Sequence, residues 1–308
     1  MKSSMVLVEF LLFPGLLFTA IAGLLTTWVD RKVTALVQMR VGPPLLQPFY
    51  DIRKLLIKET CVPEDGAVGL FLLAPLLGLA GVTLASMILW RTLLNVQATF
   101  VGDLIVLVYL LVMPALSVML GSFASRNPLA SLGGSREVKL MIAYELPLVL
   151  AILVPVIQAN SIRLGDLLTA QAPIFSLSGA LALLVCIACT QAKLTIVPFD
   201  MPEAETELSG GALIEYSGPP LAMFKLTRAM MLFTMPVLLV VLFFGGVVSG
   251  PGWLPAVTGF LLWFVLVAVT IVVRNTTPRV RIDQAVRFFW GPVSLVALVA
   301  VMLAWLGW

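Results

Sequence analysis

The chain has 308 residues, of which 60% are apolar and only 11% are charged. This composition excludes a water-soluble globular protein, because a soluble fold could not hide so much apolar surface. It predicts an all-α, polytopic integral membrane protein that forms a single domain over residues 1–308. The chain has no histidine, which argues against haem, histidine-ligated zinc and histidine-based catalysis.

Eight segments are long and apolar enough to cross a bilayer as helices. A spanning helix needs about 20 residues, since each residue rises about 1.5 Å and the hydrocarbon is about 30 Å thick. The predicted spans cover residues 5–29, 67–90, 100–123, 138–159, 174–197, 223–248, 253–273 and 289–308. The first span, with Lys2 before it and Ala20-Ile21-Ala22 within it, could be read as a signal peptide. Its apolar run is too long for one, so we expect it to stay uncleaved.

The basic residues are distributed unevenly between the two sides. The loops after spans 1, 3, 5 and 7, with their flanks, hold 16 of the 19 Lys and Arg residues. The positive-inside rule therefore places these loops in the cytoplasm and both termini outside, in the cytoplasmic (inner) membrane of a cell.

The loop between spans 1 and 2 contains a predicted amphipathic helix over residues 45–58. One face of this helix is apolar, and the other carries Gln47, Asp51, Lys54 and Lys58. The pattern indicates a helix that lies at the cytoplasmic interface. A simple surface anchor would explain the two faces. It would not explain Arg53, which projects onto the apolar side and needs a partner or a wet cavity.

Span 4 carries a carboxylate at membrane depth. Its segment reads GSREVKLMIAYELP from Gly134, with Gly133-Gly134-Ser135 interpreted as a turn and N-cap and Glu145 about eight residues into the helix. Such a carboxylate must face the bundle interior and either pair or take up a proton. Lys193, near the inner end of span 5, is the predicted partner. Two alternatives stay open: Lys193 could snorkel to the headgroups, and Glu145 could belong to a fixed structural ion pair.

An acidic segment follows span 5, and it is the strongest functional signal in the chain. From Lys193 to Pro220 the chain has no further basic residue but five of its 16 acids, namely Asp200, Glu203, Glu205, Glu207 and Glu215. Acids this dense beside a bilayer cost free energy unless they are solvated, protonated or paired. Helix capping after Pro202 would account for one or two of them, not five. The segment therefore predicts a protein that moves charge.

Two cysteines form a C-x-x-C pattern in span 5, at Cys186 and Cys189. A redox or metal-binding pair needs an accessible, electropositive site, whereas these residues fall in the apolar belt. We interpret them as small packing residues.

Four segments together resemble one family, the eight-span membrane subunit shared by respiratory complex I and energy-converting, membrane-bound nickel–iron hydrogenases. They are WVDRKVTALVQMRVGPPLLQPFYDIRKLLIKE from Trp28, GSREVKLMIAYELP from Gly134, the acidic segment from Lys193, and RNTTPRVRIDQAVRFFW from Arg274. Their order and spacing cover nearly the whole chain. The resemblance implies a subunit that joins the membrane arm to a cytoplasmic electron-transfer arm.

By position, the resemblance also implies roles for individual residues. The proton or ion path would be formed by Glu145, Asp200, Glu203, Glu205, Glu207, Glu215 and Lys193. The cavity at the arm interface, which admits quinone in complex I, would be bordered by Arg31, Arg40, Asp51, Arg53 and Lys54. No cofactor is expected on this chain; the nickel–iron site and iron–sulfur clusters would lie in partner subunits. The expected partners are hydrogenase-like or complex I-like hydrophilic arm subunits, antiporter-like membrane subunits and lipids, with no nucleic acid.

One departure from complex I bears on the branch of the family. Between Arg40 and Gln47 the chain is compact, where the complex I pattern has a longer loop, and this form is more similar to the hydrogenases. The acidic segment keeps the complex I style. The sequence therefore favours a non-redox, ion-translocation-coupling subunit of a hydrogenase-type oxidoreductase moving H⁺ or Na⁺, with the quinone-chamber subunit of complex I as the alternative. A free-standing secondary transporter is a weaker third reading, because such folds usually show internal repeats.

Overall fold

The computed structural model describes residues 2–250 and 252–307, apart from the side chains of residues 2–6, 205 and 206. The predicted end of span 8 at Trp308 and the side chain of Lys2 therefore lie outside the described part. Every regular element within that part is helical, as predicted. Its longer elements are α2 (Leu16–Val37), α3 (Gln47–Ile57), α4 (Val68–Leu94), α6 (Met113–Ala124), α7 (Pro128–Ala159), α9 (Leu177–Lys193), α11 (Gly218–Phe243), α13 (Trp253–Thr276) and α15 (Ser294–Trp305).

The remaining elements are short. They are α1 (Lys2–Leu11), α5 (Asp103–Leu110), α8 (Leu164–Thr169), α10 (Glu205–Leu208), α12 (Gly245–Val248), α14 (Ile282–Phe288), the 3₁₀ turns η1 (Val96–Ala98), η2 (Pro173–Phe175), η3 (Met201–Glu203) and η4 (Gly211–Leu213), and the π-helical turn η5 (Phe289–Val293).

Seven helical segments of the described chain are long and apolar enough to span a membrane, so the predicted count of eight is not confirmed. The missing one is α9, which has only 17 residues. It stops at Lys193 because the chain turns sharply there: Thr195 adopts a left-handed φ of 49°. The Gln191 side-chain amide donates to the Val197 carbonyl at 2.8 Å and closes the turn.

Two predicted spans are interrupted by proline. The first divides into α1 and α2 around Pro14, and the third divides into α5 and α6 just before Pro114. Proline has no backbone N–H to donate and its ring clashes with the preceding turn, so a continuous helix is disfavoured there. The prediction of unbroken helices over residues 5–29 and 100–123 was wrong in this respect.

Helix α7 begins earlier than the sequence suggested, at Pro128, with Asn127 as its N-cap. The Asn127 side chain accepts a hydrogen bond from the Leu129 backbone N–H at 2.8 Å. Gly133-Gly134-Ser135 lies inside the helix, so its interpretation as a turn and N-cap was wrong. A Cβ at Gly133 would lie 2.3 Å from the Ala212 nitrogen, which shows that this glycine lets η4 approach the helix.

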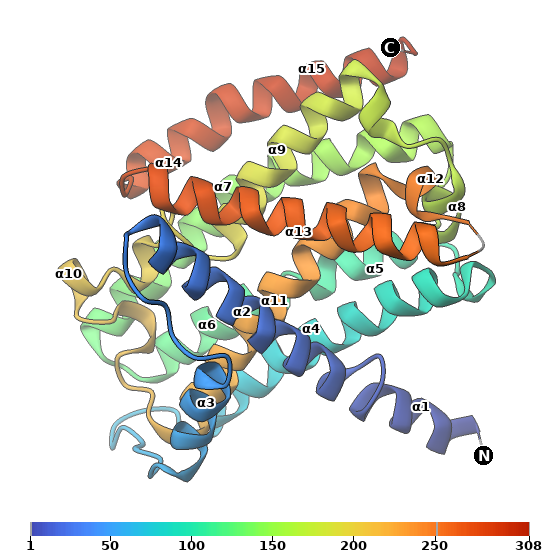
Figure 1. The fold of residues 1–308 in the computed structure, drawn as a ribbon. Helices are drawn as coiled ribbons and strands as arrows, with labels where there is room; N and C mark the ends of the chain where they lie inside the picture. Colours follow the sequence, from blue (N-terminus) through green and yellow to red (C-terminus); the bar gives the residue numbers. More distant parts are fainter. Residues whose placement is uncertain (1, 251, 308) are drawn as a thin grey trace.

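The helices pack around α11, which is the most deeply buried of the spanning segments, whereas α13 lies at the periphery (Figure 1). Helix α11 contacts α2, α3, α4 and α13. At one end of the bundle lie α3, α10 and α14; at the other lie α8, α12 and both chain termini (Figure 1). The predicted interfacial helix over residues 45–58 is present as α3. Because the acidic segment and α3 share one end, the two predicted functional regions face the same side.

Candidate functional site

A buried ion pair joins the end of α9 to the middle of α7. The Lys193 Nζ atom lies 3.1 Å from Glu145 Oε2, with side-chain exposures of 2% for Lys193 and 25% for Glu145. The ammonium also lies 5.3 Å from the centre of the Tyr144 ring, where a cation is attracted to the π face. Lys193 therefore does not snorkel, and the predicted pairing with Glu145 is present.

The acidic segment is held by polar partners from distant parts of the chain. Described side chains pair as follows: Asp200 with Arg279 at 2.8 Å, Glu203 with Arg228, Glu207 with Arg136 at 2.5 Å, and Glu215 with Asn127. The side chain of Glu205 lies outside the described residues. Three of these contacts are ion pairs, so most of the segment's negative charge is compensated by arginines of α7, α11 and the loop before α14.

Two local features fix the course of this segment. The Tyr216 ring stacks on Phe71 of α4 with ring centres 4.0 Å apart, and its hydroxyl donates to the Phe71 carbonyl at 2.9 Å. Burial raises the pKa of Tyr216, which keeps the hydroxyl protonated as a donor. Gly211 has a φ of 57°, and a Cβ there would lie 1.9 Å from the Pro202 carbonyl oxygen. The loop therefore folds tightly back onto η3.

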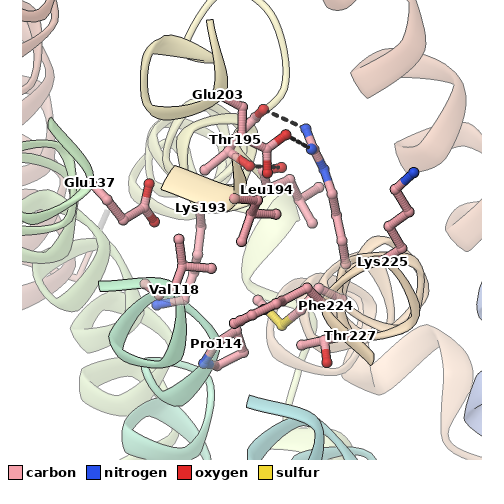
Figure 2. A pocket seen from close by; sticks show the side chains of 14 residues that line it. Pro114, Val118, Glu137, Lys193, Leu194, Thr195, Glu203, Phe224, Lys225 and Thr227 are labelled. Carbon is pink, nitrogen blue, oxygen red and sulfur yellow. Dashed lines mark hydrogen bonds and ion pairs between the residues drawn. The ribbon is translucent and has the colours of Figure 1, made fainter. Parts of the chain in front are cut away.

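Beside the Lys193 pair lies an internal cavity of about 120 Å³ between α6, α7, α11 and the turn after α9. Its charged lining includes Glu137, Lys193, Glu203 and Arg228 (Figure 2). Figure 2 shows Glu137 on one side of Lys193 and Glu203 on the other, with dashed contacts from Glu203 and Thr195 to the α11 guanidinium. The cavity thus connects the acidic segment to the interior of the bundle.

Glu137 is the functional candidate that the sequence reasoning missed. Its residue exposure is 2%, and its Oε2 atom has no hydrogen-bond partner among the described residues. The predicted turn over the GSRE stretch concealed it, because that turn places Glu137 outside the regular part of α7. Glu137 precedes Tyr144 by seven residues, which is close to two helical turns, so a longer helix would have placed both on one face.

The second predicted site, around α3, is assembled only in part. Arg31 donates to Asp51 Oδ2 at 2.7 Å, and Gln47 donates to Asp51 Oδ1 at 3.0 Å. Burial raises the pKa of Asp51, but the hydrogen bonds from Arg31 and Gln47 and the charges of Arg31 and Lys54 outweigh it and hold the pKa below its ordinary value. The two remaining predicted residues, Arg40 and Arg53, are exposed.

A larger apolar cavity of about 800 Å³ lies between α2, α4, α11 and α13. Its aromatic lining includes Trp28, Trp90, Phe233 and Trp263, and Leu45 reaches it from the segment before α3. The indole N–H of Trp28 donates to the Pro43 carbonyl at 3.1 Å, which ties this segment to α2. Its volume and apolar lining suit a long hydrophobic molecule.

Comparison with known proteins identifies the family. The model of the family described as NADH dehydrogenase matches residues 9–305. The chain belongs to the NADH dehydrogenase family. In Geobacillus thermodenitrificans, the NADH-quinone oxidoreductase component designated H is 38% identical, a match that covers 92% of this chain and 91% of the relative. In Syntrophobacter fumaroxidans, the NADH-quinone oxidoreductase component designated H 2 is 37% identical, over 91% of this chain and 90% of the relative.

A solved structure shares the whole fold. The chain superposes with a TM-score of 0.85 on a chain of the membrane-bound sulfane sulfur reductase, an archaeal respiratory membrane complex, at 26% sequence identity. The match covers 97% of this chain and 99% of the archaeal one. The resemblance to the complex I and hydrogenase family is therefore confirmed, and this family member is similar over its full described length to a subunit of a respiratory complex.

Proposed function

We propose that the chain is the membrane-anchoring, ion-translocation-coupling subunit of an energy-converting, hydrogenase-type respiratory complex. The observation that carries the proposal is the sequence of charged groups from the acidic segment inward. Glu203 lines the same cavity as Lys193, and Lys193 pairs with Glu145 inside the bundle. Carboxylates and a lysine in this arrangement are typical of ion pathways in membrane proteins.

The coupling would be electrostatic. A charge change at a redox site next to the acidic segment would alter the proton affinity of the nearest carboxylate. Two unit charges ~4 Å apart at an effective dielectric near 20 interact by ~4 kcal/mol, or about three powers of ten in proton affinity. Because neighbouring carboxylates interact with one another, they would titrate as a group and pass the change inward.

Electron transfer itself would take place in partner subunits. In this proposal the chain holds no redox cofactor, and the nickel–iron site and iron–sulfur clusters belong to the cytoplasmic arm. Cys186 and Cys189 are fully buried in the main hydrophobic core, where they pack as apolar groups. The exposed Arg31, Arg40, Arg53 and Lys54 at the α3 end would face the arm, and antiporter-like subunits would adjoin the membrane-embedded surface.

The hydrogenase branch is supported by two observations. The segment from Arg40 to Gln47 is compact, and the archaeal respiratory subunit matches nearly the full length of both chains. The second candidate is the quinone-chamber subunit of complex I, which the names of the curated relatives and the 800 Å³ apolar cavity favour. Both candidates share the coupling role and differ in the electron acceptor.

The branch can be tested by composition. An affinity tag on this chain should recover the intact complex from native membranes, and peptide mass spectrometry should detect a nickel-site large subunit. Recovery of NADH-oxidising subunits, together with loss of activity on quinone depletion, would support the complex I alternative. Recovery of the chain alone, stable and active in ion transport, would refute both.

The coupling role needs a separate test in proteoliposomes that contain the whole complex. We expect Glu145→Gln, Glu207→Gln and Glu215→Gln to retain electron transfer and to build a smaller ion gradient per electron. Glutamine keeps the shape and hydrogen bonding of glutamate but carries no exchangeable acidic proton. An unchanged ratio in all three variants would mean that these carboxylates serve only to hold the fold.

A further inference from the structure

Glu137 has an environment unlike that of the paired acids around it. Its side chain is almost completely buried in α7, and one carboxylate oxygen has no partner among the described residues. Of the acids in the neighbouring segment whose side chains are described, each contacts an arginine or an asparagine. An unpartnered carboxylate in such a place is costly, so its retention calls for an explanation.

The charges around Glu137 do not balance when every group is ionised. The groups that act on it are Glu203 from η3, Arg228 from α11 and Lys193 from α9. Lys193 is engaged by Glu145 and Arg228 by Glu203. Each cation is thus matched by another carboxylate, and Glu137 remains as one uncompensated negative charge. Lys225 also borders the cavity, but its side chain is exposed. One bound cation would bring the cluster to neutrality.

We propose that Glu137 is a proton-binding relay residue, which accepts a proton from the Glu203 side of the internal cavity and delivers it toward the Lys193–Glu145 pair. This inference rests on the coupling function proposed above. The cavity of about 120 Å³ connects the residues named, and it has room for about four waters at about 30 Å³ each. Tyr144, whose buried hydroxyl has no partner among the described residues, follows Glu137 two turns along α7. A short water chain could therefore carry the proton between them.

The lining favours a proton over a metal cation. Hard cations need several oxygen ligands at once. Here Thr227 already donates to the Met223 carbonyl at 2.8 Å, and the Thr195 carbonyl accepts from Arg228 at 2.6 Å. The lining also presents the Lys193 ammonium and the Arg228 guanidinium, which repel a metal cation. A proton needs only the Glu137 carboxylate.

The test uses the intact complex in proteoliposomes with the variants Glu137→Gln and Glu137→Asp. We expect Glu137→Gln to retain electron transfer, while ion uptake per electron falls by about tenfold or more, within the range that a positioned proton-transfer group contributes. Glu137→Asp should recover part of the ratio, since it keeps an acid. Asp103→Asn is the matched control: Asp103 is also buried with one unpartnered oxygen, but it binds the Leu164 N–H near α8, at the far end of the bundle (Figure 1). We expect it to leave the ratio unchanged.

A spectroscopic readout separates proton binding from a structural role. Infrared difference spectra of the wild-type complex between high and low pH should contain the carbonyl band of a buried carboxylic acid. That band should disappear in Glu137→Gln and shift in Glu137→Asp. Should Glu137→Gln fail to assemble, the band in Glu137→Asp decides: a band that does not move overturns the proposal. Uptake that follows sodium and not pH would also overturn it.

The outcomes distinguish this inference from the proposed function. If Glu145→Gln lowers the ion-to-electron ratio and Glu137→Gln does not, the coupling function stands and the relay at Glu137 is refuted. If Glu145, Glu207 and Glu215 can all be replaced without effect while the Glu137 band is present, the coupling function fails and proton binding at Glu137 remains.

Discussion

The Lys193–Glu145 pair allows a quantitative prediction about a charge pair inside the bundle. Its perturbation is Glu145→Gln, which removes the negative charge and leaves the Lys193 ammonium with a side-chain exposure of 2%. At the observed 3.1 Å, the two charges attract by about 5 kcal/mol at an effective dielectric near 20. The net cost is smaller, because the carboxylate is also released from a desolvated site.

Losing one member of a buried pair typically destabilises by about 3–5 kcal/mol. The glutamine carbonyl can still accept from the ammonium, and a hydrogen bond to a charged group contributes about 1.5–3 kcal/mol. We therefore expect Glu145→Gln to lower the free energy of unfolding by about 2 kcal/mol, small enough for the complex to assemble. Lys193→Met should cost less, because it leaves a carboxylate that is 25% exposed and can be hydrated. The double variant should recover most of the loss, since no charge is then left unpaired.

The assay is a denaturing-detergent titration of the purified complex, followed by circular dichroism and by release of the tagged subunit. The four forms give a double-mutant cycle whose coupling energy should be about 2 kcal/mol. If the two single substitutions cost the same and their effects simply add, the two charges do not interact, and the reasoning from distance and burial is refuted.

Three further predictions concern the ends of the site. Gly133→Ala should loosen the acidic segment, because the new Cβ would lie 2.3 Å from the Ala212 nitrogen; faster protease cleavage within residues 205–209 would report it. Tyr216→Phe should lower the free energy of unfolding by about 1 kcal/mol, because the Phe71 carbonyl loses its donor while the ring stack remains. The Asp51 pKa is lowered in the folded protein, so its stabilising contribution is present above its ordinary pKa and is lost as the pH falls through the lower, folded value. Amide exchange in α3 should therefore accelerate below about pH 4, and Asp51→Asn should abolish this pH dependence.

Much of the fold was accessible from the sequence, because apolar length and charge bias depend on the bilayer and not on tertiary contacts. The positions of α4, α11 and α13 follow from it to within a few residues. The placement of both termini outside stays a prediction. The end of α9 was not accessible, since it depends on the Gln191 side chain closing the turn on the Val197 carbonyl. Gly133 misled the prediction because its reason for being glycine, the approach of η4, is tertiary.

The candidate site was predictable in its residue types and not in its pairings. The concentration of acids after Lys193 indicated a functional segment. The partners Arg136, Arg228 and Arg279 are distant in sequence, and only the packed bundle brings them to the acids. Glu137 could have been found from its spacing to Tyr144, had α7 been extended to Pro128.

The shortness of α9 affects how a membrane voltage would act on the proposed ion path. Its 17 residues rise about 26 Å, less than the ~30 Å hydrocarbon layer. If its far end lies at the opposite surface, Lys193 lies below the membrane surface, and the polar turn after it brings a water-like dielectric inward. The voltage then falls over a shorter distance between Lys193 and the other side, which strengthens the local field. Moving one charge through the full drop requires about 2.3 kcal/mol per 100 mV. Because little of that drop falls across the acidic segment, its carboxylates would exchange protons with the cytoplasm almost independently of membrane potential, and the voltage-sensitive step would begin at Lys193.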